Sequence, residues 1–255
     1  MLSKFKDNAF LFTELVKRDF KKKYKRTYLG VLWSLLSPML TLLVMRLVFT
    51  HFFGRDIPHY TTYLFCGNII FAYFADASSG GMTSLLDNSP IFSKINVPKH
   101  LFLFSRNVSS LINFSLTFLI FIIFALIDGV SITPTFLMLF FPIACLIIFN
   151  VGVGLILSAL YVFFRDMQYL WGIFTQLLMY VSAIFYSVSE LPSALRGAFY
   201  ANPVFVYITY FRTVVLEGAI PSLELHALAI IYALLAFALG ALIYKRYNHK
   251  FLYYV

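Results

Sequence analysis

Two charged side chains lie inside long apolar runs of this sequence, where a charge is costly unless it is paired, hydrated or able to reach the surface. At a rise of about 1.5 Å per residue, Arg46 lies about 10 Å below the nearer end of its run, and Asp76 lies about 10 Å deeper than Arg46. This difference in depth argues against a direct salt bridge between them. Arg46 therefore either extends toward the membrane surface or lines a water-filled path.

Enzyme chemistry has little support in the sequence. There is no Gly-x-x-x-x-Gly-Lys phosphate loop, the five histidines are scattered, and the two cysteines, Cys66 and Cys145, lie inside apolar runs. A membrane glycosyltransferase would need acidic groups for a metal or a base, and the chain has only 11 Asp and Glu residues. We therefore expect no catalytic residues, no metal site and no bound cofactor.

Membrane helices are the elements that must position these polar side chains. The chain is 61% hydrophobic and 12% charged, with a mean hydropathy of +0.84, which excludes an ordinary soluble domain. Scattered Ser, Thr and Asn residues inside the apolar runs are typical of helix–helix contacts. Runs of about 20 residues or more predict an all-α membrane protein whose six-span domain covers residues 31–255. The expected transmembrane helices are 31–53, 63–86, 104–127, 135–162, 169–188 and 225–244.

The distribution of basic residues orients these spans. Most Lys and Arg residues precede the first span, follow the second or lie at the carboxyl end, whereas the opposite side has Arg55, Arg196 and Arg212. The positive-inside rule then places both termini in the cytoplasm. The net charge of +9 follows from this topology, so we do not expect a nucleic-acid partner.

Residues 1–30 predict an amphipathic interface helix at the membrane surface. Phe5, Ala9, Phe12 and Val16 recur at spacings of three or four, while the basic residues from Lys17 onward fall away from that stripe. The apolar face would enter the headgroup boundary and the cations would meet anionic membrane lipid. A simple juxtamembrane anchor is the alternative interpretation.

Two segments between the predicted spans have apolar residues in patterns that are not typical of simple loops. Residues 87–100 contain a turn followed by a short apolar face, which predicts a short amphipathic element or a connector along the membrane. Residues 189–222 are too apolar for an ordinary loop, and Asn202-Pro203 divides them into two pieces too short to span. We expect a re-entrant pair of helices on the outer side, with a surface pair that shields the span ends as the alternative.

The order of several motifs resembles the permease subunits of polysaccharide ABC exporters, which export O-antigen, teichoic acid or capsule. The motifs are Arg18-Asp19, Tyr24, Tyr28-Leu29-Gly30, Trp33, Pro38, the Pro-containing loop at 87–100, Arg165-Asp166 and Asn202-Pro203. The resemblance implies a homodimer in the bacterial inner membrane, paired with two copies of a separate ATPase subunit that binds the ATP. Its expected function is outward export of lipid-linked polysaccharide.

The resemblance also implies roles for particular residues. The lipid-linked end of the polymer would enter beside the interface helix, where cations could meet its diphosphate: Lys22, Lys23, Tyr28, Leu29, Gly30 and Trp33. The loop that couples to the ATPase would use Pro90, Phe92, Lys94 and Pro98. The outer gate would use Pro192, Asn202, Pro203 and Tyr207.

Aromatic side chains are the expected lining of the path. The chain is 19% Phe, Trp and Tyr, and rings offer the apolar faces of sugars a platform with few strong hydrogen bonds to break. We expect Tyr73, Phe74 and Tyr180 to line the path together with Arg46. A lipid or drug ABC exporter permease is one alternative. An ion-coupled secondary transporter is another, although the sequence has one broken region and no clear internal repeat.

Overall fold

The computed structural model describes residues 2–24, 27–53, 57–95, 97–189 and 191–254, and these fold into helices and connecting loops without a strand. In the first half of the chain the elements are α1 (Leu2–Tyr24), η1 (Gly30–Leu32), α2 (Trp33–Phe53), α3 (Tyr60–Asp87), α4 (Ser89–Phe92) and α5 (His100–Ile127). In the second half they are η2 (Pro134–Leu139), α6 (Phe140–Phe163), α7 (Met167–Val181), α8 (Ser193–Phe199), α9 (Pro203–Val215), α10 (Leu223–Tyr247) and η3 (Phe251–Tyr253).

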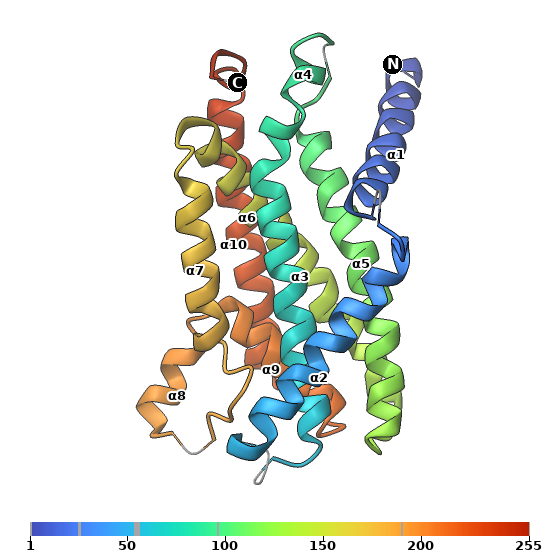
Figure 1. Cartoon of the computed structure of the whole chain (residues 1–255). Coiled ribbons are helices and arrows are strands. Elements are labelled where there is room, and N and C mark those ends of the chain that lie inside the picture. Colours follow the sequence, from blue (N-terminus) through green and yellow to red (C-terminus); the bar gives the residue numbers. More distant parts are fainter. Residues whose placement is uncertain (1, 25–26, 54–56, 96, 190, 255) are drawn as a thin grey trace.

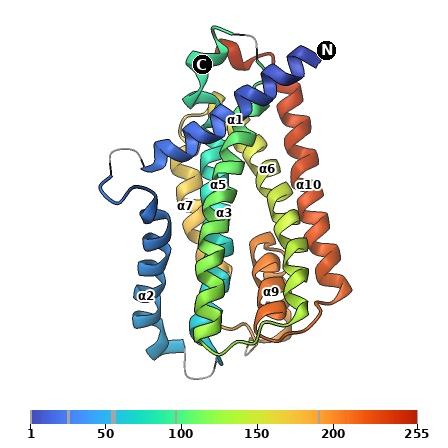
Figure 2. The same ribbon diagram turned by 90° about the vertical axis from the view of Figure 1, so that its right-hand side faces the viewer.

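The long helices form an upright bundle around α3 and α6. Helices α3, α5, α6, α7 and α10 run along its length, α2 lies obliquely on one side, and both termini lie at the same end (Figure 1, Figure 2). We term this end the terminal end. At the terminal end, α1 lies across the bundle and packs on α5 (Figure 2).

The prediction of an all-α membrane protein is confirmed. Within the described residues, 4 helices are long and apolar enough to cross a membrane: Trp33–Thr50, His100–Ile127, Pro134–Phe163 and Leu223–Tyr247. The other two predicted spans correspond to α3, which carries several polar residues, and to α7, which has 15 residues. The count of six spans stays a prediction.

Glycine allows the central helices to approach closely. A Cβ on Gly152 of α6 would meet the backbone of Ala236 on α10, and a Cβ on Gly240 would meet the carbonyl oxygen of Gly152. A Cβ on Gly81 of α3 would lie 3.0 Å from the Cα of Gly154. Small residues at such crossings allow membrane helices to pack closely.

The fifth predicted span, 169–188, is shorter in the structure because α7 ends at Val181. The chain then turns back into the bundle, with Ala183 at a φ of 50°. The buried guanidinium of Arg212 holds this turn: its Nη1 donates to the carbonyl of Ala183 at 2.9 Å, and its Nη2 donates to that of Ile184 at 3.0 Å. Arg212 also stacks 3.4 Å above the ring of Tyr63.

The segment 189–222 does contain two short helices that meet at Asn202-Pro203. Helix α8 is exposed, whereas α9 is buried against α3, α6 and α10 at the end of the bundle opposite the termini (Figure 1). The Oδ1 of Asn202 accepts a hydrogen bond from the backbone N–H of Val204 at 3.0 Å, and its Nδ2 donates to Ser182 Oγ at 2.9 Å. Asn202 is therefore a helix cap that also fastens α9 to the end of α7.

Candidate functional site

The main polar feature of the bundle is a crevice between α2, α3 and α5. Its larger part has a volume of about 460 Å³, its smaller part about 330 Å³, and Asp76, Ser110 and Asn113 line both parts. We term the two parts together the polar crevice. Other residues of the larger part are Thr27, Trp33, Ser34, Ser37, Pro38, Thr41, Asn68, Ile69, Ala72, Tyr73, Phe114 and Thr117.

Helical spacing explains why these residues share one crevice. Residues three or four apart on a helix lie on the same face, so each of the three helices contributes one narrow stripe. The stripes are Ser34, Ser37 and Thr41 on α2; Asn68, Ala72, Asp76 and Gly80 on α3; and Ser110, Asn113 and Thr117 on α5. The larger part is lined by hydroxyl and amide groups together with the rings of Trp33, Tyr73 and Phe114. Such a lining suits a hydroxylated chain that slides through without strong binding.

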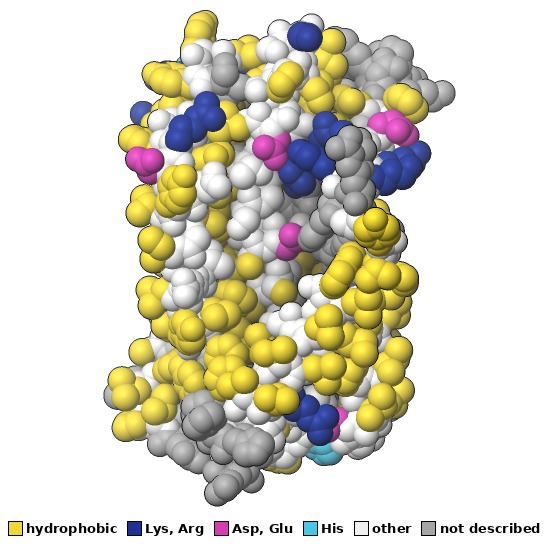
Figure 3. Space-filling view, in the orientation of Figure 1, with side chains coloured by type: hydrophobic (Ala, Val, Ile, Leu, Met, Phe, Trp, Pro, Cys, Tyr) yellow, Lys and Arg dark blue, Asp and Glu magenta, His cyan; other side chains and the backbone are white. Residues whose placement is uncertain are grey.

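Charged groups gather where the crevice reaches the terminal end. Asp19, Lys22 and Arg106 line the smaller part of the crevice. Figure 3 shows Lys, Arg, Asp and Glu side chains mainly near this end and apolar side chains over much of the rest of this face. The crevice therefore passes from a mouth with several charged groups into a polar interior in which Asp76 is the charged residue of the described lining.

The carboxylate of Asp19 is buried and joins α1 to α5. Arg18 donates to its Oδ1 from Nη2 at 2.7 Å, and Ser105 Oγ on α5 donates to its Oδ2 at 3.0 Å. The Nε of Arg106 lies 4.0 Å from the same Oδ2. A buried carboxylate needs such partners because its desolvation is costly.

The same network reaches the start of the loop at 87–100. Arg18 Nη2 donates to Asn88 Oδ1 at 2.7 Å, and Arg106 Nη2 donates to Asp87 Oδ2 at 2.8 Å. Asn88 is buried and donates from its Nδ2 to the carbonyl of Ser84 at 2.7 Å. We term these five residues, Arg18, Asp19, Asn88, Asp87 and Arg106, with Ser105, the junction network.

The structure brings two of the residues predicted at the substrate entrance to the polar crevice. Lys22 lines the smaller part and Trp33 the larger part. Tyr28 and Leu29 are exposed on the connection from α1 to α2, and Gly30 takes a φ of 51° at the turn into η1, a conformation that favours glycine. The side chain of Lys23 lies outside the described residues.

The structure separates the predicted path residues. Tyr73 lines the polar crevice. Phe74 is buried among Phe149 and Trp171, with ring centroids 5.9 and 6.0 Å away. Tyr180 on α7 and Arg46 on α2 are exposed, and neither belongs to the described crevice lining.

The predicted coupling loop contains a short helix, α4, which includes Pro90 and Phe92. Lys94 is exposed, Pro98 is half-buried before α5, and the ring of Phe92 is buried 5.9 Å from that of Phe102. Phe92 therefore fastens the loop to the bundle. Contact between this loop and an ATPase stays a prediction.

The predicted outer-gate residues have structural partners. Pro192 precedes α8 as its cap, Asn202 and Pro203 begin α9, and Tyr207 is fully buried with its hydroxyl donating to the carbonyl of Ala229 at 2.9 Å. The gating role of all four residues stays a prediction.

Sequence reasoning did not reveal the burial of Arg212 and its hydrogen bonds, the crevice as a unit or the junction network. The spacing of the polar residues within each helix was visible in the sequence, but it does not reveal which stripes face one another. The Arg18-Asp19 pair was noticed as a motif, without its buried position.

Comparison with known proteins places the chain in a family. The profile of the family described as ABC-2 type transporter matches residues 11–216, a range that includes the polar crevice, the junction network and α9. The chain belongs to the ABC-2 type transporter family. An ion-coupled secondary transporter, one alternative left by the sequence, does not fit this membership.

Relatives of this ABC-2 type transporter protein are similar over nearly their whole length. It is 28% identical over 241 residues to the O-antigen export system permease protein RfbA of Myxococcus xanthus, covering 92% of each chain. It is 26% identical over 251 residues to the protein of that name from Klebsiella pneumoniae, covering 95% of each. It is 23% identical to the polysialic acid transport protein KpsM of Escherichia coli, covering 89% of this chain and 90% of that one.

Proposed function

We propose that this protein is the channel-forming subunit of an ATP-driven exporter and that its polar crevice conducts a lipid-linked polysaccharide. The single observation that carries the proposal is the lining of the crevice, which combines hydroxyl and amide groups with aromatic rings from three helices. Sugars present hydroxyl edges and apolar faces, so this lining offers many weak contacts. The relatives are named for O-antigen export and polysialic acid transport, and these names support the same substrate class.

The terminal end faces the cytoplasm in this proposal, because Lys and Arg residues concentrate there. The diphosphate of the lipid-linked end meets Lys22 at the crevice mouth, and Trp33 stands where the sugar chain passes into the larger part. Six helices span the membrane, with α3 and α7 added to the four that length and composition identify. Helices α8 and α9 enter from the outer side and close the far end.

A separate ATPase subunit supplies the force. When the ATPase subunit closes on ATP, it pushes the loop at 87–100. This loop contacts the interface helix α1 through Asn88, whose Oδ1 accepts a hydrogen bond from Arg18. Movement of this loop therefore changes the position of α1 and with it the crevice mouth. Binding and hydrolysis of ATP belong to the partner, and this chain provides the path.

The functional unit in this proposal is a dimer of two copies of the chain. Arg46 on α2 and Gln176 on α7 are exposed in the single chain, at positions where lipid contact would be costly. A second copy, with water between the two, would give these side chains polar surroundings. A mass of one copy for the protein in lipid nanodiscs would contradict this assembly.

The crevice is tested by filling it. Ser110 is buried and lines both parts, so Ser110→Phe should block passage, and polymer on the cell surface should fall by about tenfold or more. Ser115→Phe is the matched control, because Ser115 is exposed on the same helix and lies outside the described lining. Both variants are compared at equal membrane abundance.

Wild-type export by Ser110→Phe, at normal abundance, would refute the crevice as the path. Export of a lipid or drug instead of polymer, measured in vesicles with the ATPase subunit present, would favour the remaining alternative within the ABC exporters.

A further inference from the structure

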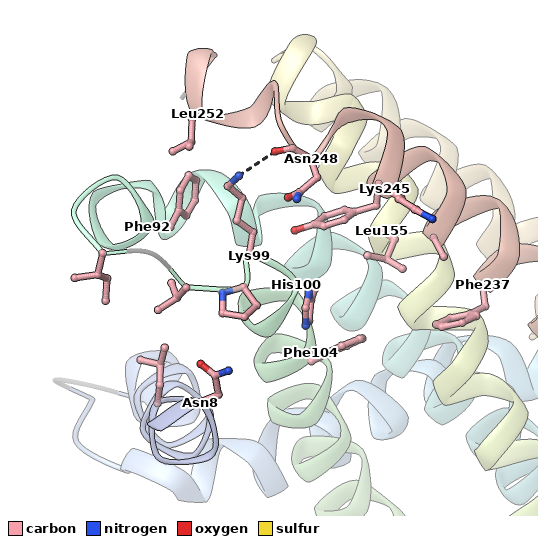
Figure 4. A pocket seen from close by; sticks show the side chains of 16 residues that line it. Asn8, Phe92, Lys99, His100, Phe104, Leu155, Phe237, Lys245, Asn248 and Leu252 are labelled. Carbon is pink, nitrogen blue, oxygen red and sulfur yellow. Dashed lines mark hydrogen bonds between the residues drawn. The ribbon is translucent and has the colours of Figure 1, made fainter. Parts of the chain in front are cut away.

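A second, larger cavity lies at the terminal end and shares no described lining residue with the polar crevice. Its volume is about 1020 Å³, and it is bounded by α1, the loop before α5, α6 and α10 (Figure 4). The lining residues used below are Lys99, Phe104, Leu155, Phe237, Ala241 and Tyr244. The proposed transport path makes no use of this cavity.

One wall of the cavity is polar and cationic. Lys99 is half-buried, and its Nζ donates to the carbonyl of Asn248 at 2.9 Å (Figure 4). Among the described residues no carboxylate forms an ion pair with Lys99, and burial lowers the pKa of its ammonium group because desolvation disfavours the charged form. An anion in the cavity would compensate this loss of hydration.

Tyr244 adds a buried hydroxyl group to the lining of this cavity. Its side chain is buried, with 7% exposed, and its hydroxyl has no hydrogen-bond partner among the described residues. A buried hydroxyl without a partner costs free energy unless a water or a ligand supplies the hydrogen bond. The cavity that Tyr244 lines is the place for such a partner.

The other wall is apolar and extends along the bundle. Phe104, Leu155, Phe237 and Ala241 form it, and Phe237 lies eight residues before Lys245 on α10, or about 12 Å along the helix axis. Lys245 and Arg246 mark the end of this helix, where its basic residues suit the headgroup level. The cavity therefore extends from the headgroup level to the depth of acyl chains.

We propose that this cavity binds an anionic phospholipid of the membrane. Its phosphate lies between the Lys99 ammonium and the Tyr244 hydroxyl, and one acyl chain lies along Phe104, Leu155 and Phe237. Charge complementarity and depth both favour this occupant: a soluble protein loop would meet the cationic wall but would not extend into the acyl region. Lys245, at the rim, adds to the positive potential that attracts the headgroup.

The bound lipid has a structural consequence. The lining includes residues of α1, of the loop at 87–100 and of α10, which are distant in the sequence. Of these, α1 and the loop also belong to the proposed entrance and coupling regions. An anionic lipid in the cavity would hold them together at a fixed spacing, so the stability of this end should depend on lipid charge.

The test uses the full chain in detergent. Its thermal unfolding is followed with added phosphatidylglycerol or phosphatidylcholine, and retained phospholipid is counted in native mass spectra. We expect phosphatidylglycerol to bind about tenfold or more tightly than phosphatidylcholine, and Lys99→Gln to weaken it by about tenfold. Lys250→Gln is the matched control, since Lys250 is an exposed lysine of the same end outside the described lining.

Two more variants separate shape from charge. Ala241→Phe fills the apolar wall and should abolish lipid retention without any change in charge. Tyr244→Phe keeps the shape of the cavity but removes the hydroxyl, and it should weaken phosphatidylglycerol binding several-fold. This variant tests the site even if Ala241→Phe does not fold. Ser110→Phe, which blocks the polar crevice, should bind phosphatidylglycerol as the wild type does, so that failure of the proposed path and failure of this site are distinguishable.

Three results would overturn the proposal. The first is equal binding of the two phospholipids. The second is unchanged phosphatidylglycerol binding by Lys99→Gln and Tyr244→Phe. The third is displacement of the lipid, either by the ATPase subunit, which would make the cavity a docking groove, or by a short-chain polyprenyl diphosphate at lower concentration, which would assign it to the exported lipid.

Discussion

Replacement of Asp19 by Asn tests whether the junction network fastens the interface helix to the bundle. The Asp19 side chain is 1% exposed, and its two oxygens accept hydrogen bonds from Arg18 and Ser105. Asn keeps the size, removes the charge and turns one acceptor into a donor. Removal of one partner of a fully buried ion pair costs about 3–5 kcal/mol.

The expected cost here is smaller, because water reaches the cations. The side chains of Arg18 and Arg106 are 41% and 21% exposed. Water can therefore solvate these two cations when the negative charge of Asp19 is removed. We therefore expect a loss of about 1.5–3 kcal/mol, the range for hydrogen bonds to charged groups. For a chain of this size that corresponds to a decrease in Tm of roughly 3–12 °C.

The assay is thermal unfolding of the purified subunit, followed by ATP turnover with the ATPase subunit present. Glu14→Gln is the control: Glu14 lies on the same helix and pairs with Lys17 at 2.8 Å, but the two side chains are 50% and 58% exposed, so its loss should change stability by less than about 0.5 kcal/mol. Equal Tm values for wild type and Asp19→Asn would refute the structural role. An intact response of ATP turnover to substrate would refute the link to coupling.

Two other substitutions test the remaining charges. Arg212→Met leaves the carbonyls of Ala183 and Ile184 without their donor and should lower the free energy of unfolding by about 2–3 kcal/mol. Arg196→Met, at an exposed position, should change it little. Equal effects of the two substitutions on thermal unfolding would contradict the role of Arg212 in holding the turn after α7. Joint replacement of Lys22 and Lys23 by Gln should reduce substrate-stimulated ATP turnover at unchanged Tm, and unchanged stimulation would argue against diphosphate capture at the mouth.

Local sequence patterns predict the long helices well because each is an apolar run whose length matches the membrane. The third and sixth spans, expected at 104–127 and 225–244, are α5 and α10. Helix α5 begins four residues earlier and ends at the predicted residue, and α10 extends two residues further at its amino end and three at its carboxyl end. The fifth was expected to reach residue 188 but ends at Val181. After Val181 the backbone carbonyls of Ala183 and Ile184 accept hydrogen bonds from Arg212 instead of from a continuing helix. Arg212 comes 28 residues after Ile184 in the sequence, so no local pattern could reveal this early end of the helix.

The aromatic residues show why the residue type and its position along a membrane helix do not determine whether a side chain lines the path or packs in the core. Phe74 and Tyr207 were expected on the path and at the gate, and the structure packs both within the core. Tyr73, one residue from Phe74, lines the crevice. Adjacent helical residues point about 100° apart, so the assignment depends on which face meets α2 and α5, and that choice is made by tertiary packing.

The division of charge along the crevice follows from the same packing and bears directly on transport. The interior stripes of α2, α3 and α5 carry hydroxyls and amides with Asp76 as the charged member, while Asp19, Lys22 and Arg106 lie at the mouth. A strong ionic contact inside the path would hold a polymer at every step, because each hydrogen bond to a charge is worth about 1.5–3 kcal/mol. Weak neutral contacts can be exchanged one for another as the chain advances. In the proposed path, capture of a charged headgroup and passage of the sugar chain therefore need different surfaces. This fold provides them by adding the charges from α1 and the terminal end of α5 to an interior of hydroxyl, amide and aromatic groups in which Asp76 is the charged residue of the described lining.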